Sequence, residues 1–133
     1  MKERYAKGDI DKKRIRSEKE RPCLIMKLGI ILQSNNAEHI WNTLRLAIAS
    51  LKAGHTVKIF LFSEGVEIDD IEDTKQFDIS TRLQEFKDLK GIILACETCL
   101  QIRSKTESKV CSTTTMKDLV KMVEESDKVL VFG

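Results

Sequence analysis

Short apolar runs alternate with segments of helical periodicity over most of the chain. Near-continuous apolar runs at residues 24–32, 56–62, 91–95 and 128–132 predict buried strands of a parallel sheet. In the segments between them, apolar residues recur at helical spacing after residue 36, between 79 and 89, and after 115. Strands that alternate with helices over short connections predict an α/β fold, a three-layer sandwich with a mostly parallel, flavodoxin-like sheet.

Polar residues near the ends of these segments indicate where the helices begin and end. Asn35, with Glu38 three residues later, predicts an N-cap, and Gly54 predicts the left-handed residue that ends the same helix. Thr115, with Asp118 three residues later, predicts the start of the last helix. We expect two polar stretches to be loops: residues 104–112, and a solvated acidic stretch without the spacing of a calcium loop (Glu67, Asp69, Asp70, Glu72 and Asp73).

The first 22 residues differ from the rest of the chain in charge and periodicity. Residues 1–21 hold nine Lys or Arg and five Asp or Glu, whereas the remaining residues hold more acidic than basic side chains. Mixed charge without an apolar face predicts a flexible basic tail at 1–22, followed by one domain at 23–133. We expect no nucleic-acid partner, because acidic residues interrupt the basic ones and Tyr5 is the single aromatic residue of the tail.

The apolar run at residues 24–32 has the features of neither a membrane span nor an export signal. It is too short to cross a bilayer, contains Lys27 and lacks a small-residue cleavage site. We therefore expect a cytoplasmic protein with no membrane contact. In a reducing compartment, a Cys-X-X-Cys motif is more often catalytic or metal-binding than structural.

Two cysteines, Cys96 and Cys99, follow directly after the apolar run at 91–95. The carboxyl ends of parallel strands are where open α/β sheets present their chemistry. A thiol at the start of a helix also has its thiolate stabilised by unpaired backbone N–H groups, which makes it a better nucleophile. The placement of the pair therefore predicts sulfur or redox chemistry.

Several functions that occur on α/β sheets require residues that this chain lacks. The segment after the first strand, residues 33–37, has no glycine to approach a phosphate. The first and third strands do not end in the carboxylates of a phosphoacceptor domain. A thioredoxin-like site requires a proline opposite the dithiol, but the single proline, Pro22, lies far upstream. Three roles of the cysteine pair remain open: redox chemistry, structural packing and zinc binding. A zinc site would need Cys111 as its third ligand and a fourth from one of three candidates (Cys23, His39 or His55).

Six blocks of sequence resemble the DsrE/DsrF-like family of small α/β proteins, which includes sulfur-relay subunits. The blocks are residues 40–47, 53–61, 64–67, 93–100 with Arg103, 115–120 and 126–130. Their order and spacing carry the resemblance, which covers residues 24–133. A Cys-X-X-Cys branch of this family has glycine after the first cysteine and Arg-Gly at the end of the segment. This chain has Glu97 and Arg103-Ser104 at those positions.

The resemblance implies a thiol-based persulfide carrier or sulfurtransferase-like protein with a DsrE-like fold. Cys96 corresponds to the cysteine that accepts a sulfane sulfur, Arg103 to the basic residue two turns later, and Cys99 to a resolving thiol. The resemblance also implies a protein sulfur donor and acceptor, a homo-oligomer (trimer or hexamer), and no cofactor or metal. The alternatives are a dithiol redox protein and a non-enzymatic binding or regulatory module. We expect Cys111, His39 and His55 to take no part in catalysis.

Overall fold

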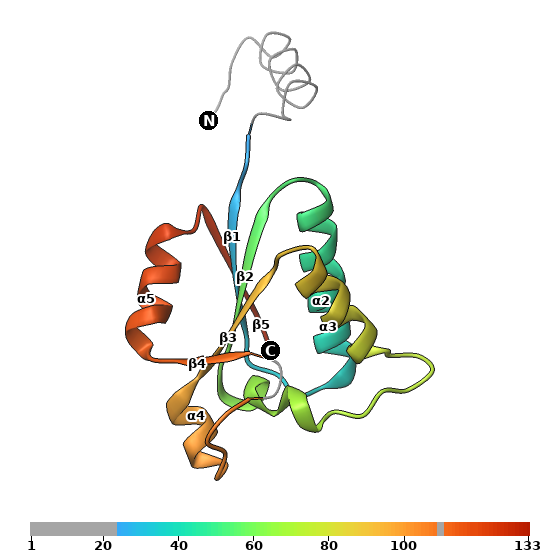
Figure 1. Cartoon of the computed structure of the whole chain (residues 1–133), viewed down its shortest axis with the longest axis vertical. Coiled ribbons are helices and arrows are strands. Elements are labelled where there is room, and N and C mark those ends of the chain that lie inside the picture. The colour runs from blue at the N-terminus through green and yellow to red at the C-terminus, as the bar shows by residue number, and fades with distance from the viewer. Residues whose placement is uncertain (1–23, 109–110) are drawn as a thin grey trace, which may run out of the picture.

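Five parallel strands form one sheet in a computed structural model that describes residues 24–108 and 111–133. The strand order is β4-β3-β2-β1-β5 (Figure 1). The strands are β1 (Lys27–Leu32), β2 (Thr56–Leu61), β3 (Ile92–Cys96), β4 (Ser112–Thr114) and β5 (Lys128–Phe132). The tail expected at 1–22 and Cys23 lie outside the described residues.

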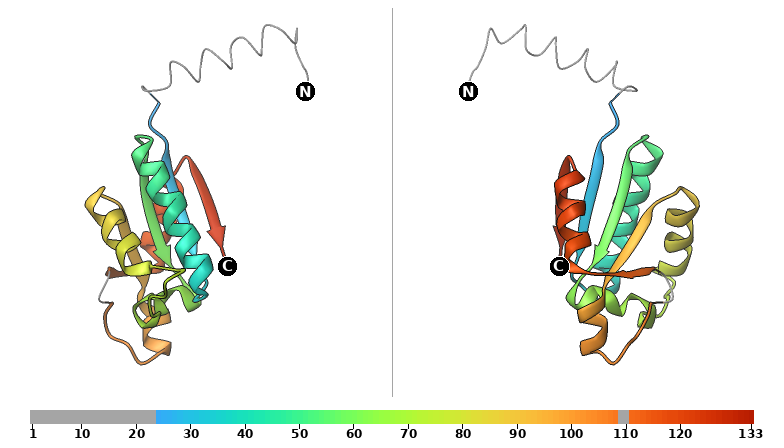
Figure 2. Two further views of the ribbon diagram at one scale, coloured as in Figure 1. Left: turned by 90° about the vertical axis from the view of Figure 1, so that its right-hand side faces the viewer. Right: turned by 60° about the vertical axis from the view of Figure 1, so that its left-hand side comes forward.

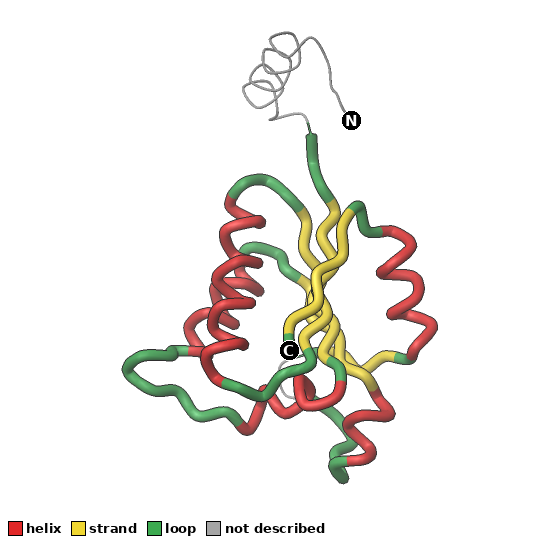
Figure 3. Tube along the Cα trace, turned by 180° about the vertical axis from the view of Figure 1, so that it is seen from behind, coloured by secondary structure: helices red, strands yellow, loops and turns green. Residues whose placement is uncertain are grey.

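Helices cover both faces of this sheet and complete the three layers. The elements that connect the strands are α2 (Ala37–Lys52), the 3-10 helix η2 (Ser63–Asp70), α3 (Ile79–Asp88), α4 (Glu97–Ile102) and α5 (Met116–Glu125). Helices α2 and α3 pack side by side on one face, and α5 lies on the other (Figures 1 and 3). The α/β sandwich with a parallel sheet is therefore confirmed. None of the helices in the described ranges is long and apolar enough to cross a membrane.

The strand order departs from that of flavodoxin, in which β1 lies between β2 and β3. Here β1 lies between β2 and β5. Strands β2, β3 and β4 are added one after another on one side of β1, and the chain then returns over the other face through α5 to place β5 at the opposite edge. The carboxyl ends of β1, β2 and β3 consequently lie next to one another, which brings the segments after them together.

The main core lies between the sheet and the α2–α3 layer. Leu28, Ile30 and Leu32 of β1 alternate with residues that face α5, and each is at most 5% exposed. The helical spacing predicted for α2 is confirmed by four buried side chains, Ile40, Leu44, Ala47 and Ile48. Gly54 follows the helix with a φ of +96°, a conformation that glycine adopts without steric cost.

The first helix begins one residue later than the sequence predicts. Its N-cap is Asn36, whose side-chain oxygen accepts the backbone N–H of His39 at 3.1 Å. Asn35 instead donates its side-chain amide to Glu67. Either asparagine could cap the helix through a local hydrogen bond. The contact of Asn35 with Glu67, 32 positions away, is what distinguishes the two. At the last helix, Thr115 is the N-cap as predicted, and the Asp118 carboxylate accepts its backbone N–H.

The acidic stretch is not a solvated loop, so that prediction is wrong. Its first half forms η2, in which Gly65, Val66 and Ile68 are buried. Its carboxylates have structural partners: Glu67 pairs with Arg103, Asp70 with Lys105, and Asp73 accepts the backbone N–H groups of Ile79 and Ser80 at the start of α3. The segment at 104–112 likewise ends in an unpredicted strand, β4, which pairs with β3.

Candidate functional site: the Cys96–Cys99 thiol pair

Cys96 is both the last residue of β3 and the N-cap of α4, so the chain changes from strand to helix at a thiol. Helix α4 begins at Glu97 and carries Cys99 in its first turn. The two cysteines are 2% and 9% exposed, respectively. The pair therefore lies just below the surface at the carboxyl edge of the sheet, and Cys99 is its more accessible member.

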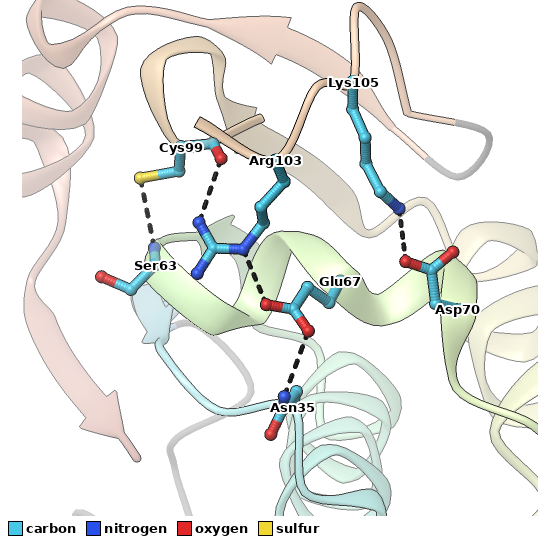
Figure 4. A network of polar contacts seen from close by, with 7 residues as sticks. All are labelled: Asn35, Ser63, Glu67, Asp70, Cys99, Arg103 and Lys105. Atoms are coloured by element: carbon cyan, nitrogen blue, oxygen red, sulfur yellow. Dashed lines mark hydrogen bonds and ion pairs between the residues drawn. The ribbon is translucent and has the colours of Figure 1, made fainter. Parts of the chain in front are cut away.

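The sulfur of Cys99 receives a hydrogen bond from the segment that follows β2. The backbone N–H of Ser63 donates to Cys99 Sγ, with a distance of 3.3 Å between nitrogen and sulfur (Figure 4). Ser63 has a φ of +51°, which is the left-handed region that non-glycine residues seldom occupy. This contact joins the thiol of α4 to the start of η2.

Cys96 has a different environment. Burial raises the pKa of its thiol, and a hydrogen bond between the two cysteine side chains raises it further. Backbone N–H groups of Cys99 and Thr98 act in the opposite direction without cancelling the effect of burial. Burial therefore disfavours the thiolate form of Cys96. The two thiols are therefore unequal in burial and in their hydrogen-bond partners.

Arg103 braces the site and does not bind a sulfur. Its Nε donates to the Glu67 carboxylate at 2.6 Å, and its Nη1 donates to the backbone carbonyl of Cys99 at 3.0 Å (Figure 4). Within the described residues, no hydrogen bond joins this guanidinium to either thiol. Side-chain hydrogen bonds from Arg103 and then Asn35 lower the pKa of Glu67, which keeps that carboxylate charged. The resulting Asn35–Glu67–Arg103 chain connects the end of β1, η2 and α4.

Glu67 and Asn35 are site residues that sequence reasoning missed. Glu67 was assigned to a solvated loop, and Asn35 to a helix cap. Each lies more than 30 positions from its partner in this chain of contacts. The one signal in the sequence was Arg103 itself, a cation that requires a counter-charge when it is partly buried. Nothing in the sequence indicates which of the neighbouring carboxylates supplies it.

Cys111 is half-buried in the segment before β4. Its Sγ donates to Ser108 Oγ at 3.1 Å, and burial raises the pKa of its thiol. It does not form a cluster with Cys96 and Cys99, because no group of three or more His, Cys, Asp or Glu side chains within 24–108 and 111–133 is placed to hold a metal ion. The sequence predicts no catalytic role for Cys111, and its hydrogen bond to Ser108 does not involve the thiol pair.

Each of the two histidines has a hydrogen-bond partner at its Nδ1 atom. Nδ1 of His39 lies 2.9 Å from Ser34 Oγ at the start of α2. Nδ1 of His55 accepts the backbone N–H of Met26 at 3.1 Å. Both contacts join a helix end or turn to the start or end of β1, so the histidines have structural partners away from the thiols.

Comparisons with known proteins give the same fold and place the chain in a family. It is 30% identical over 115 residues to the uncharacterized protein MJ0989 of Methanocaldococcus jannaschii, an alignment that covers 80% of this chain and 100% of that protein. The crystal structure of the YchN protein from E. coli superposes with a TM-score of 0.70 at 21% identity, covering 82% of this chain and 100% of the other. The sequence model of the DsrE/DsrF-like family matches residues 26–132. The chain belongs to the DsrE/DsrF-like family.

Proposed function

We propose that this protein carries sulfane sulfur as a persulfide on its thiol pair, and that Cys99 is the residue that accepts it. The observation that supports this proposal best is the Ser63 N–H donated to Cys99 Sγ. Sulfur transfer requires a thiolate, because the thiolate is the nucleophile. Membership in a family that includes sulfur-relay subunits supports the same chemical class.

The assignment reverses the roles that the resemblance implies for the two cysteines. Cys96 occupies the position expected to accept sulfur, yet it is the more buried thiol and burial raises its pKa. Cys99 is more exposed and receives an N–H from Ser63 in addition to its contact with Cys96. Arg103 acts as a positioning residue, because it holds the Cys99 carbonyl and not the sulfur.

In the transfer step, the Cys99 thiolate attacks the outer sulfur of a donor persulfide, R–S–SH. A new S–S bond forms between Cys99 and that sulfur while the S–S bond of the donor breaks. The electron pair leaves with the donor sulfur, which takes up a proton as R–SH. No net oxidation or reduction occurs, because the sulfane sulfur moves from one thiol to another by the chemistry of thiol–disulfide exchange.

Cys96 allows a second step that would release the sulfur as hydrosulfide. Its thiolate would attack the inner sulfur of the Cys99 persulfide, form a Cys96–Cys99 disulfide and expel HS⁻. Both cysteine sulfurs are oxidised, and the sulfane sulfur is reduced. The raised pKa of Cys96 keeps this step slow near neutral pH, so the persulfide survives long enough to reach an acceptor protein.

The test is to treat the full chain with a cysteine desulfurase and cysteine, and separately with inorganic polysulfide. Intact-mass spectrometry then measures whether one sulfur atom is added, and peptide mapping locates it. We expect the adduct on Cys99, its loss in Cys99→Ser, and its retention in Cys96→Ser. Cys111→Ser is the matched control, since it removes a partly buried thiol outside the pair and should not change the adduct.

Three results would contradict the proposal in distinguishable ways. An adduct that survives in Cys99→Ser but disappears in Cys96→Ser would restore the roles implied by the resemblance. A disulfide between the two cysteines with no added sulfur under either donor would favour a dithiol redox protein. The absence of both products from a correctly folded chain would favour a binding or regulatory module.

A further inference from the structure

Two exposed carboxylates flank the thiol pair, one from each of the two short helices that meet there. Glu97 directly follows Cys96 and lies in the first turn of α4, which also carries Cys99. Glu64 directly follows Ser63, whose backbone N–H donates to Cys99 Sγ, and lies in the first turn of η2. Both glutamates are exposed. Each is therefore the chain neighbour either of a thiol or of the residue that donates to one.

The cations at the end of α4 are already paired with other carboxylates. Arg103 Nε lies 2.6 Å from the Glu67 carboxylate, and Lys105 Nζ lies 2.6 Å from that of Asp70. Within the described part of the chain, neither of the two flanking glutamates forms an ion pair. The negative charges beside the thiols are consequently not neutralised by the positive charges on the same two elements.

The other elements at this edge of the sheet do not compensate these charges either. The segment after β1, residues 33–35, and strand β4 hold no charged side chain. Helix α5 begins with an exposed cation, Lys117, which is followed directly by Asp118, and helix α2 has a carboxylate, Glu38, in its first turn. Among the described residues, the surroundings of the thiol pair therefore have a net negative charge.

Such charges act on any charged molecule that approaches the thiols. In water, a unit charge about 10 Å from an exposed carboxylate changes its local concentration, and hence its reaction rate, by about twofold. Carboxylates in the first turn of a helix also stabilise the helix through its dipole. That structural role does not distinguish a cationic reagent from an anionic one, so a comparison of reagents separates the two roles.

We infer that Glu64 and Glu97 set the charge preference of the thiol pair, so that donors with a positive charge beside the transferred sulfur react faster than anionic donors. The substrate class of the proposed carrier is then a cationic persulfide, and inorganic polysulfide, which is an anion, is a slow donor. This inference rests on the proposed function for the identity of its substrate. The charge preference itself belongs to the two thiols and is measured without a persulfide.

The test measures thiol–disulfide exchange with three small disulfides: cystamine, which is cationic, bis(2-hydroxyethyl) disulfide, which is neutral, and dithiodiglycolate, which is anionic. A Cys23→Ser/Cys111→Ser chain confines the reaction to the thiol pair. A cysteine thiolate attacks the probe, the S–S bond of the probe breaks, and one half leaves as a thiolate. Intact-mass spectrometry after an acid quench follows the loss of the fully reduced chain, which reports the first attack whichever cysteine makes it.

We expect the ratio of the cystamine rate to the dithiodiglycolate rate to fall about fourfold in Glu64→Gln and in Glu97→Gln, because each loses a twofold effect on both probes. The rate with the neutral probe should change little. In 1 M NaCl the variants should approach the unmodified chain, since the Debye length is then about 3 Å. Glutamine keeps the size of these exposed side chains, so the fold should be retained, which circular dichroism checks.

The matched control is Glu124→Gln, which removes the same charge at an exposed position near the end of α5. This end of α5 lies at the end of the sheet opposite to η2 and α4, which lie side by side (Figure 2). The rate ratio should therefore stay as in the unmodified chain.

Three results would overturn the inference: a ratio unchanged in both variants, an equal fall in Glu124→Gln, or a difference that persists in 1 M NaCl. Each of them leaves the proposed persulfide carrier intact. Conversely, a ratio that falls as expected in a chain that takes up no sulfur would reject the carrier and retain the charge preference.

Discussion

Cys96 is buried more deeply than Cys99, and this difference predicts that the release of hydrosulfide depends on pH. Burial raises the pKa of Cys96 above the usual range of a cysteine thiol. The fraction of Cys96 present as thiolate therefore grows about tenfold per pH unit through the neutral and mildly alkaline range, as for any group below its pKa. Release of hydrosulfide from the Cys99 persulfide requires that thiolate.

We accordingly expect hydrosulfide release from the persulfidated protein to accelerate as the pH rises from 7 to 9, values that lie below the raised pKa of Cys96. A sulfide-selective electrode measures the rate after excess donor has been removed. Cys96→Ser should abolish the release while the persulfide itself is retained. A rate that does not change over this pH range would mean that Cys96 is not the attacking thiol.

Gly65 allows a close approach between η2 and the end of β1, next to the site. A Cβ at this position would overlap the backbone carbonyl oxygen of Leu32, which cannot move without disturbing the sheet. We expect Gly65→Ala to destabilise the fold by about 3 kcal/mol, the upper end of the usual range for overpacking in a core. Urea unfolding followed by circular dichroism measures the change.

The matched control for this substitution is Gly54→Ala. Gly54 has a positive φ, but no atom lies within 4 Å of an added Cβ. Its substitution should cost about 1 kcal/mol, for the left-handed backbone alone. Equal losses at the two positions would show that the contact with Leu32 does not decide the effect.

At the scale of elements, α4 and η2 are held together by the Arg103–Glu67 ion pair. Helix α4 has six residues, too few to be stable without tertiary contacts. Arg103 connects it to η2 through Glu67 and also holds the carbonyl of Cys99. Loss of this brace should release the α4 backbone and the thiol that it carries.

We therefore expect Arg103→Ala to lower stability by about 1 kcal/mol and to increase the rate at which iodoacetamide alkylates Cys99. Arg103→Lys keeps the charge but not the forked geometry, so it should restore stability more than it restores protection of the thiol. Lys105→Ala is the control, because Lys105 pairs with Asp70 of the same η2 but does not contact Cys99. An unchanged alkylation rate in Arg103→Ala would argue against the positioning role.

Across the whole molecule, carboxylates that connect separate elements predict sensitivity to acid. Hydrogen bonds from Arg103 lower the pKa of Glu67, and those from Ser80 lower the pKa of Asp73. A carboxyl whose pKa is lower in the folded state stabilises the fold above its unfolded pKa, and this stabilisation disappears as the pH falls through the folded value. The unfolded values lie near 4.

The free energy of unfolding should thus be constant from about pH 7 to 5 and fall below about pH 5. Urea titrations at several pH values measure this dependence. Glu67→Gln and Asp73→Asn should be less stable than the unmodified chain at pH 7 and should show a flatter fall in acid. Glu72→Gln, at an exposed position, should leave the pH dependence unchanged, and an equal change in all three variants would contradict the assignment.

The residues and elements that depend on nearby sequence were predictable from the chain alone. The buried strands, the stripes of α2 and α3, the Thr115 cap and the position of Cys96 at a strand end all follow from hydrophobic periodicity and local hydrogen bonding. These properties extend over a few residues, so a short window of sequence contains their cause. The same local reasoning placed the first N-cap one residue early, because Asn35 and Asn36 are equivalent within such a window.

Tertiary structure alone decided which of these parts meet. It placed Glu67 against Arg103, turned the Ser63 N–H toward Cys99, and added β4 to the edge of the sheet beside β3. It also left Met116, Val120 and Val123 of α5 exposed. Each of these outcomes joins segments far apart in the chain, where burial and the choice of charge partner are set by the packing of the whole fold. The sequence by itself therefore determined the α/β sandwich and located the thiol pair, whereas the inequality of the two thiols came from the contacts around them.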